Sequence, residues 1–209
     1  MRRTGSLGAL GAFLLTAAAP LFAVDEPEYR VVERDEPIEI RAYAPMVVAE
    51  TRVEGTLERA GSRAFRTLFK YIDGANRARQ EIAMTAPVTQ QRASEKIAMT
   101  APVTQQRAGA GWAVRFVLPA DYTLETAPEP NDPRVAIRQV PAHRAAVIRY
   151  SGTWSEGRYR EHLARLREWL DARGLETTGD PVWARYDAPY MPWFLRRNEI
   201  LLRLPDADG

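Results

Sequence analysis

The stretch MVVAETRVEGTLERAGSRAFRTLFKYI, residues 46–72, changes its pattern of hydrophobic residues at Gly55. Before this glycine, residues Met46–Val53 have the short apolar pattern of a β-strand. After it, apolar residues return with a period of 3.6, which predicts an amphipathic helix over Leu57–Ile72. The apolar side of this helix carries Leu57, Ala64, Phe65, Leu68, Phe69 and Ile72.

A second stretch repeats this order of elements about a hundred residues later. A strand over 144–150 leads to Gly152, and a helix over 156–173 follows it. Ser155 is a typical N-cap and Gly174 a typical helix stop. Gly55 and Gly152 are 97 positions apart, which predicts two similar halves with one long helix each.

The remaining apolar segments read as short strands separated by turn signals. Mixed strands with two long helices predict an α+β domain, with an antiparallel sheet or barrel that carries the helices outside. The predicted strands cover residues 29–34, 38–43, 46–53, 112–118, 135–140, 144–150, 182–186 and 199–204.

An exact internal repeat is the most unusual feature of the chain. The twelve residues IAMTAPVTQQRA occur at 82–93 and again at 97–108, with an offset of 15. Proline cannot donate to a sheet ladder, so Pro87 and Pro102 favour an edge strand or a loop for each copy. We interpret the repeat as a local duplication that lengthens a surface hairpin.

Residues 1–23 differ from the rest of the chain. Two arginines, Arg2 and Arg3, precede an apolar run, and no acidic residue occurs before Asp25. This layout is typical of a secretory signal peptide, with a retained membrane anchor as the alternative. We expect a single domain over 24–209, without a membrane span, in the periplasm or outside the cell.

Composition excludes several function classes. Residues 1–23 hold two of the 29 basic residues and none of the 27 acidic ones, so the predicted mature domain is formally neutral. A nucleic-acid partner is therefore not expected. The chain has no cysteine, which excludes disulfides, thiol catalysis, and both covalent and cysteine-ligated heme.

Three segments together resemble the SOUL/heme-binding protein family. They are KIAMTAPV at 96–103 with its near copy at 81–88, the strand pair at 29–33 and 38–43, and PWFLRRNEI at 192–200. The resemblance implies a distorted antiparallel β-barrel of two pseudo-symmetric halves, each with one long flanking helix. It also implies non-covalent binding of heme or a related tetrapyrrole, here as a carrier, buffer or scavenger in the cell envelope.

The family's binding region lies beside its first long helix, which corresponds to Leu57–Ile72. The resemblance thus implies an apolar wall and propionate-binding cations on this helix, although both sets could simply pack on the sheet or face solvent. Because they fall on opposite helix faces, the ligand would bind at an edge or use cations at 77–79. The wall candidates are Phe65, Leu68, Phe69 and Ile72, and the cation candidates are Arg63, Arg66 and Lys70.

The iron ligand stays open at this stage. Some family members use a histidine early in the chain, but the only two histidines here are His143 and His162. We include His162 among the cofactor-binding candidates and keep His143 as a weaker one. Less favoured ligands are Met84, Met99, Tyr43 and Tyr71.

Two other functions compete with tetrapyrrole binding. The family is related in fold to GyrI-like domains, some of which bind small molecules or hydrolyse them. Glu199 or Glu50 could be a general base if an apolar site raised its pKa, although Arg196 and Arg197 favour a structural ion pair for Glu199. We therefore expect a binding protein rather than an enzyme, and no transcriptional role for a small-molecule sensor.

Overall fold

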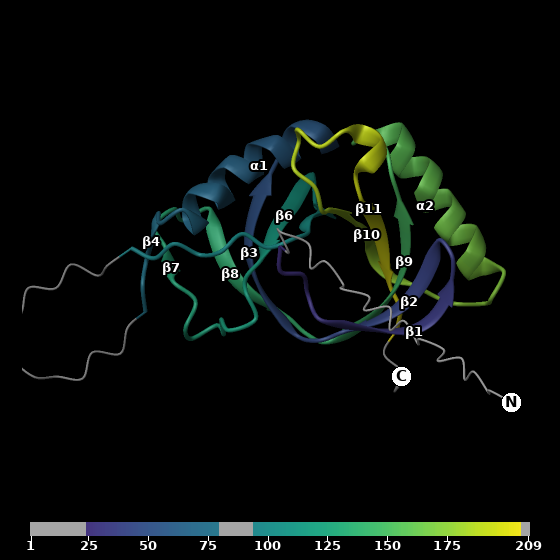
Figure 1. Cartoon of the computed structure of the whole chain (residues 1–209), viewed down its shortest axis with the longest axis horizontal. Helices are drawn as coiled ribbons and strands as arrows, with labels where there is room; N and C mark the ends of the chain where they lie inside the picture. Colours follow the sequence, from purple (N-terminus) through teal and green to yellow (C-terminus); the bar gives the residue numbers. More distant parts are fainter. Residues whose placement is uncertain (1–23, 80–93, 206–209) are drawn as a thin grey trace, which may run out of the picture.

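The computed structural model describes residues 24–79 and 94–205, and its main element is a curled nine-stranded antiparallel sheet (Figure 1). The predicted signal peptide and the first repeat copy lie outside the described residues. The strand order is β1-β2-β9-β11-β10-β5-β6-β3-β8. The strands of this sheet are β1 (Tyr29–Asp35), β2 (Ile38–Tyr43), β3 (Met46–Val53), β5 (Val103–Ala108), β6 (Gly111–Val117), β8 (Val135–Val140), β9 (His143–Tyr150), β10 (Thr178–Arg185) and β11 (Asn198–Arg203).

Two long helices cover one face of this sheet (Figure 1). They are α1 (Leu57–Ile72) and α2 (Glu156–Asp171). A short ladder pairs β4 (Asn76–Arg77) with β7 (Glu129–Pro130), and a single 3-10 turn, η1, spans Trp193–Leu195. Within the described ranges, no helix has the length and apolar character needed to cross a membrane.

The strand order confirms the two predicted halves. Leaving out the edge strand β1, one half has the order β2-β9-β11-β10 and the other, read from the opposite edge, has the order β8-β3-β6-β5. The two halves meet where β10 pairs with β5. Each helix follows the matching strand, β3 or β9. Gly55 and Gly152 have φ values of 115° and 130°, a region that favours glycine, and so let the chain turn from strand to N-cap.

The core lies between the helices and the sheet. Under α1, Leu68 and Ile72 pack with Phe116 of β6. Under α2, Leu166 packs in a second cluster with Ile200 of β11. Because side chains alternate along a strand, every second residue points to the opposite face, which we call the inner face.

Closure into a barrel is the part of the fold prediction that the structure does not bear out. The edge strands β1 and β8 are not paired with each other in the described part of the chain, so the sheet is curled but open. Most of β1 is exposed. The two halves join through the β5–β10 pairing.

The second repeat copy is also placed differently from the prediction. Its residues Val103–Ala108 form β5, an interior strand that pairs with both β6 and β10. Pro102 lies one residue before the strand and therefore interrupts no ladder. The prediction of an edge strand is wrong for Val103–Ala108, whereas residues 97–102 lie in a loop, as the alternative predicted. The interpretation of the repeat as a local duplication stays a prediction.

Candidate functional site

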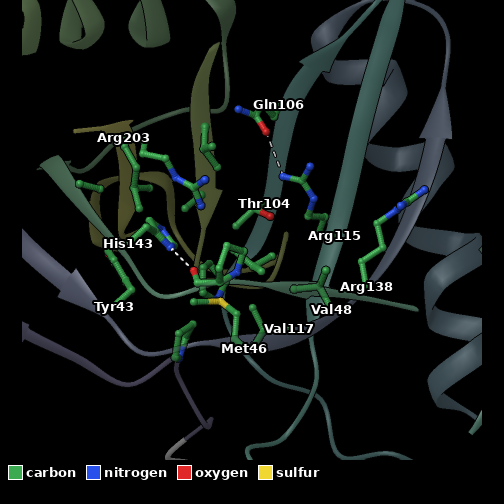
Figure 2. Close-up of a pocket in the computed structure, with 18 of the residues that line it drawn as sticks. Tyr43, Met46, Val48, Thr104, Gln106, Arg115, Val117, Arg138, His143 and Arg203 are labelled. Carbon is green, nitrogen blue, oxygen red and sulfur yellow. Dashed lines mark hydrogen bonds between the residues drawn. The ribbon is translucent and has the colours of Figure 1, made fainter. Parts of the chain in front are cut away.

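A pocket of about 400 Å³ opens on the inner face of the sheet, away from both helices (Figure 2). This volume lies within the range of small-molecule sites. Strands from both halves contribute alternate residues, which is why the side chains converge here. The apolar lining includes Met46, Val48, Val117, Val182, Ala184 and Leu201.

Glu50 of β3 is the acidic group at the centre of one wall. It is 4% exposed and accepts hydrogen bonds from Arg115 Nε at 2.8 Å and Arg138 Nε at 3.1 Å. Burial favours a raised pKa for Glu50, but the hydrogen bond and charge of Arg115, with the charge of Arg138, outweigh it, and the pKa is lowered. Glu50 is therefore an ionised partner of arginines, and it lacks the raised pKa that the general-base hypothesis required.

Glu199 of β11 is fully buried and equally well paired. Arg41 approaches both carboxylate oxygens, at 2.8 and 3.1 Å, and Arg197 Nε donates at 3.0 Å. The Tyr186 hydroxyl donates at 2.7 Å. Against burial, these contacts lower the pKa of Glu199. The predicted ion pair is confirmed for Arg197, whereas Arg196 binds the carbonyls of Pro189 and Met191 instead.

The charged lining of the pocket is basic. Three arginines, Arg115, Arg138 and Arg203, face two acids, Glu50 and Asp180. The side chain of Arg203 makes no hydrogen bond or ion pair within the described part of the chain. Figure 2 shows Arg203 on one side of the pocket and Arg115 with Arg138 on the other. The pocket thus presents cations on opposite walls.

His143 lies in the wall of this pocket. Its Nδ1 is 2.9 Å from the carbonyl oxygen of Pro141, which can only accept, so this nitrogen carries the proton (Figure 2). The ring stacks on Tyr43 with centroids 5.2 Å apart. These two contacts fix the orientation of the imidazole.

The residues predicted on α1 are divided between two environments. Leu68 and Ile72 are buried in the core, and Phe65 packs against Phe116 with ring centroids 5.3 Å apart. Phe69 is 41% exposed. The cations Arg63, Arg66 and Lys70 lie exposed on the outer side of the helix. None of these residues lines the inner-face pocket, and their binding of a tetrapyrrole stays a prediction.

His162 lies on the buried side of α2 and does not line the pocket. It is 6% exposed and stacks on Tyr150 with centroids 4.0 Å apart. Neither ring nitrogen has a hydrogen-bond partner among the described residues. Burial lowers its pKa. Its role as an iron ligand stays a prediction, and within the described ranges no group of three or more His, Asp or Glu side chains is arranged to hold a metal ion.

Sequence reasoning named three of the inner-face residues, Tyr43, Glu50 and His143, as weaker candidates. It missed the others, although a signal for them exists. Val48 and Glu50 alternate with the helix-facing Val47 and Ala49 along β3. The same alternation applies to β6 and β10. Once the helix-facing residues are known, this alternation predicts which residues face away from the helices. It does not predict the curl of the sheet that brings those residues together.

Comparison with known proteins assigns the family. The sequence model of the SOUL heme-binding protein family matches residues 24–203. The chain belongs to this family. No protein of curated function matches the chain by sequence. SOUL membership supports tetrapyrrole binding at the level of the family.

Solved structures show that the SOUL chain shares its fold with other proteins. The C-terminal domain of EcmrR superposes with a TM-score of 0.59 and 12% identity, over 85% of this chain and 98% of that one. A hydrolase encoded by lin2189 of Listeria innocua gives 0.53 and 10%, over 80% and 91%. At these identities the likeness extends to the fold alone.

Proposed function

We propose that this chain binds a tetrapyrrole non-covalently in the inner-face pocket, with the anionic propionates at the pocket arginines. The observation that carries this proposal is an apolar pocket between the two halves whose rim includes Arg203, a cation without a counter-ion among the described residues. Membership of the SOUL family supports the ligand class.

The residues present fit a heme-sized ligand in chemistry. The macrocycle needs apolar walls, which Val48, Val182 and Leu201 supply from three strands. Burial of several hundred Å² of macrocycle contributes on the order of 10 kcal/mol before the costs of immobilisation are subtracted. Arginine offers a fork that matches a carboxylate. Bound heme would supply an iron centre, and His143 in the pocket wall would be a candidate to hold it.

The charges of the pocket favour an anionic ligand over a lipophilic cation. Glu50 is already surrounded by Arg115, Arg138 and Arg52, so it has no unbalanced negative charge to offer to a cation. With both buried carboxylates held by arginines and neither pKa raised, we infer that this protein binds its ligand rather than hydrolyses it. The signal-like residues 1–23 support a carrier, buffer or scavenger role in the cell envelope.

The test is a titration of hemin, and separately of iron-free protoporphyrin IX, into residues 24–209 with detection at the Soret band. Saturation by both at similar affinity is expected for a pocket that does not depend on the iron. Saturation by hemin alone would point to an axial ligand and lead to His143→Ala and His162→Ala. Saturation by neither would overturn the proposal.

Variants locate the ligand. Arg203→Gln should weaken both titrations about 10-fold, since one charge-assisted hydrogen bond is lost. The control Arg165→Gln removes another exposed charge, from α2, and should change nothing. If Phe69→Ala and Arg66→Gln weaken binding while Arg203→Gln does not, the tetrapyrrole binds beside α1 as the family resemblance predicts.

A further inference from the structure

The outer side of α1 carries a row of unpaired cations, which we call the α1 stripe. It consists of Arg59, Arg63, Arg66 and Lys70, all exposed. None of them forms an ion pair with a carboxylate in the described part of the chain. Glu58 is the one acidic residue of the helix and accepts a hydrogen bond from the Glu156 backbone N–H. The stripe is therefore a net positive surface, in which the charge of Lys70 also acts on the carboxylate of Asp132.

The second helix offers an internal comparison, because its exposed charges are balanced. Arg160 pairs with Glu156 at 2.6 Å and Arg158 with Glu161 at 3.6 Å. A helix that only faces water is expected to mix charges of both signs in this way. The charge of α1 is thus a property of that helix and not of every exposed surface of this protein.

An aromatic loop projects next to the stripe. It consists of Tyr190, Trp193, Phe194 and Leu195, which are 89%, 57%, 58% and 62% exposed. Arg196 holds the loop backbone through the Met191 and Pro189 carbonyls, at 2.8 and 2.6 Å. The large side chains therefore point outward from a fixed backbone and are not folded back onto the core.

The loop and the stripe lie on the same side of the molecule. The N-terminal ends of α1 and α2 meet where the Glu156 N–H binds Glu58 at 3.2 Å. The Gly152 N–H binds the Trp193 carbonyl at 3.1 Å, which ties the loop to the segment before α2. Figure 1 shows the loop at the adjoining ends of both helices. None of the four loop residues lines the inner-face pocket.

We propose that this helix-side surface docks on the anionic face of a lipid bilayer. Tryptophan and tyrosine side chains favour the membrane–water interface. Basic side chains near an anionic leaflet are attracted to its headgroups. The aromatic loop enters the interface while the α1 stripe contacts the headgroups, and the pocket faces away from the bilayer. This docking does not depend on tetrapyrrole binding.

The experiment is co-sedimentation of residues 24–209 with vesicles of phosphatidylcholine, with or without one quarter phosphatidylglycerol, in the absence of porphyrin. Binding is expected to the anionic vesicles and to fall with added salt. The triple variant Arg63→Gln, Arg66→Gln, Lys70→Gln should lose about 100-fold in partition coefficient. The matched control Arg160→Gln, Arg165→Gln, Arg167→Gln removes the same charge from α2 and should lose less than about threefold.

A second measurement reports on the aromatic loop itself. Trp193→Ala should remove the blue shift of tryptophan fluorescence that anionic vesicles induce in the wild type, with an unchanged circular dichroism spectrum, because the side chain is exposed. Equal binding to neutral and anionic vesicles, no binding at all, or equal losses in the two triple variants would overturn the proposal.

Discussion

Glu199 is a single buried charge on which the pairing of several neighbours depends. Replacing its carboxylate with an amide leaves Arg41 and Arg197 without their shared counter-ion. Breaking such a buried pair costs about 3–5 kcal/mol. We therefore expect Glu199→Gln to lower the free energy of unfolding by that amount at pH 7, measured by urea denaturation. An unchanged midpoint and slope would show that the arginines find other partners.

The same residue gives the protein a pH dependence at acid pH. The folded-state pKa of Glu199 lies below its ordinary value of 4.5, so the unfolded chain takes up the proton first as pH falls. Stability from this group is thus present above about pH 4.5 and is lost as pH falls through the folded pKa. In Glu199→Gln the decline in stability below pH 4.5 should be smaller than in the wild type.

His162 makes the stability of the fold depend on pH in a second, higher range. Burial lowers its pKa below the ordinary 6.5, so the folded state favours the neutral ring while the unfolded chain binds a proton. Stability should therefore decrease as pH falls below 6.5. His162→Phe keeps the stack on Tyr150 and should flatten this part of the pH profile of unfolding. A profile identical to wild type between pH 5 and 6.5 would contradict the prediction.

Among the elements, two glycines should respond oppositely to alanine. A Cβ at Gly111, the first residue of β6, would lie 2.5 Å from the Val53 carbonyl oxygen of β3. Backbone must then shift, and Gly111→Ala should cost about 1–3 kcal/mol. Gly157 of α2 has open space around its Cβ position. Gly157→Ala should stabilise by about 0.5 kcal/mol through helix propensity, and thermal unfolding distinguishes the two signs.

The duplicated segment can be tested as an element of its own. The side-chain amide of Asn76 forms two hydrogen bonds with the backbone of Glu95, of 2.7 and 2.9 Å. Deleting residues 80–94, one repeat length, joins Arg79 to Glu95 and retains Asn76, Glu95 and β5 in the chain. We expect a change in unfolding free energy of less than about 1 kcal/mol. A larger loss would show that the first copy contributes to the folded core.

Over the whole molecule, the periodicity of hydrophobic residues predicted the features that depend on local sequence, namely the type and bounds of several elements. The bounds of α1, β2 and β3 match the sequence prediction, and the paired glycines correctly indicated two halves. The interior position of β5 was missed because Pro102, just before the strand, favoured an edge or loop. The pocket was missed because it depends on how far the sheet curls, which is set by long-range pairing between β5 and β10.

The central claim is the location of the tetrapyrrole, and ring-current shifts in methyl NMR spectra test it most directly. Protoporphyrin IX bound in the inner-face pocket should shift the methyl signals of Val48, Val182 and Leu201 and leave those of Leu68 and Ile72 unchanged. Shifts confined to Leu68 and Ile72, beneath α1, would contradict the account and place the ligand beside that helix.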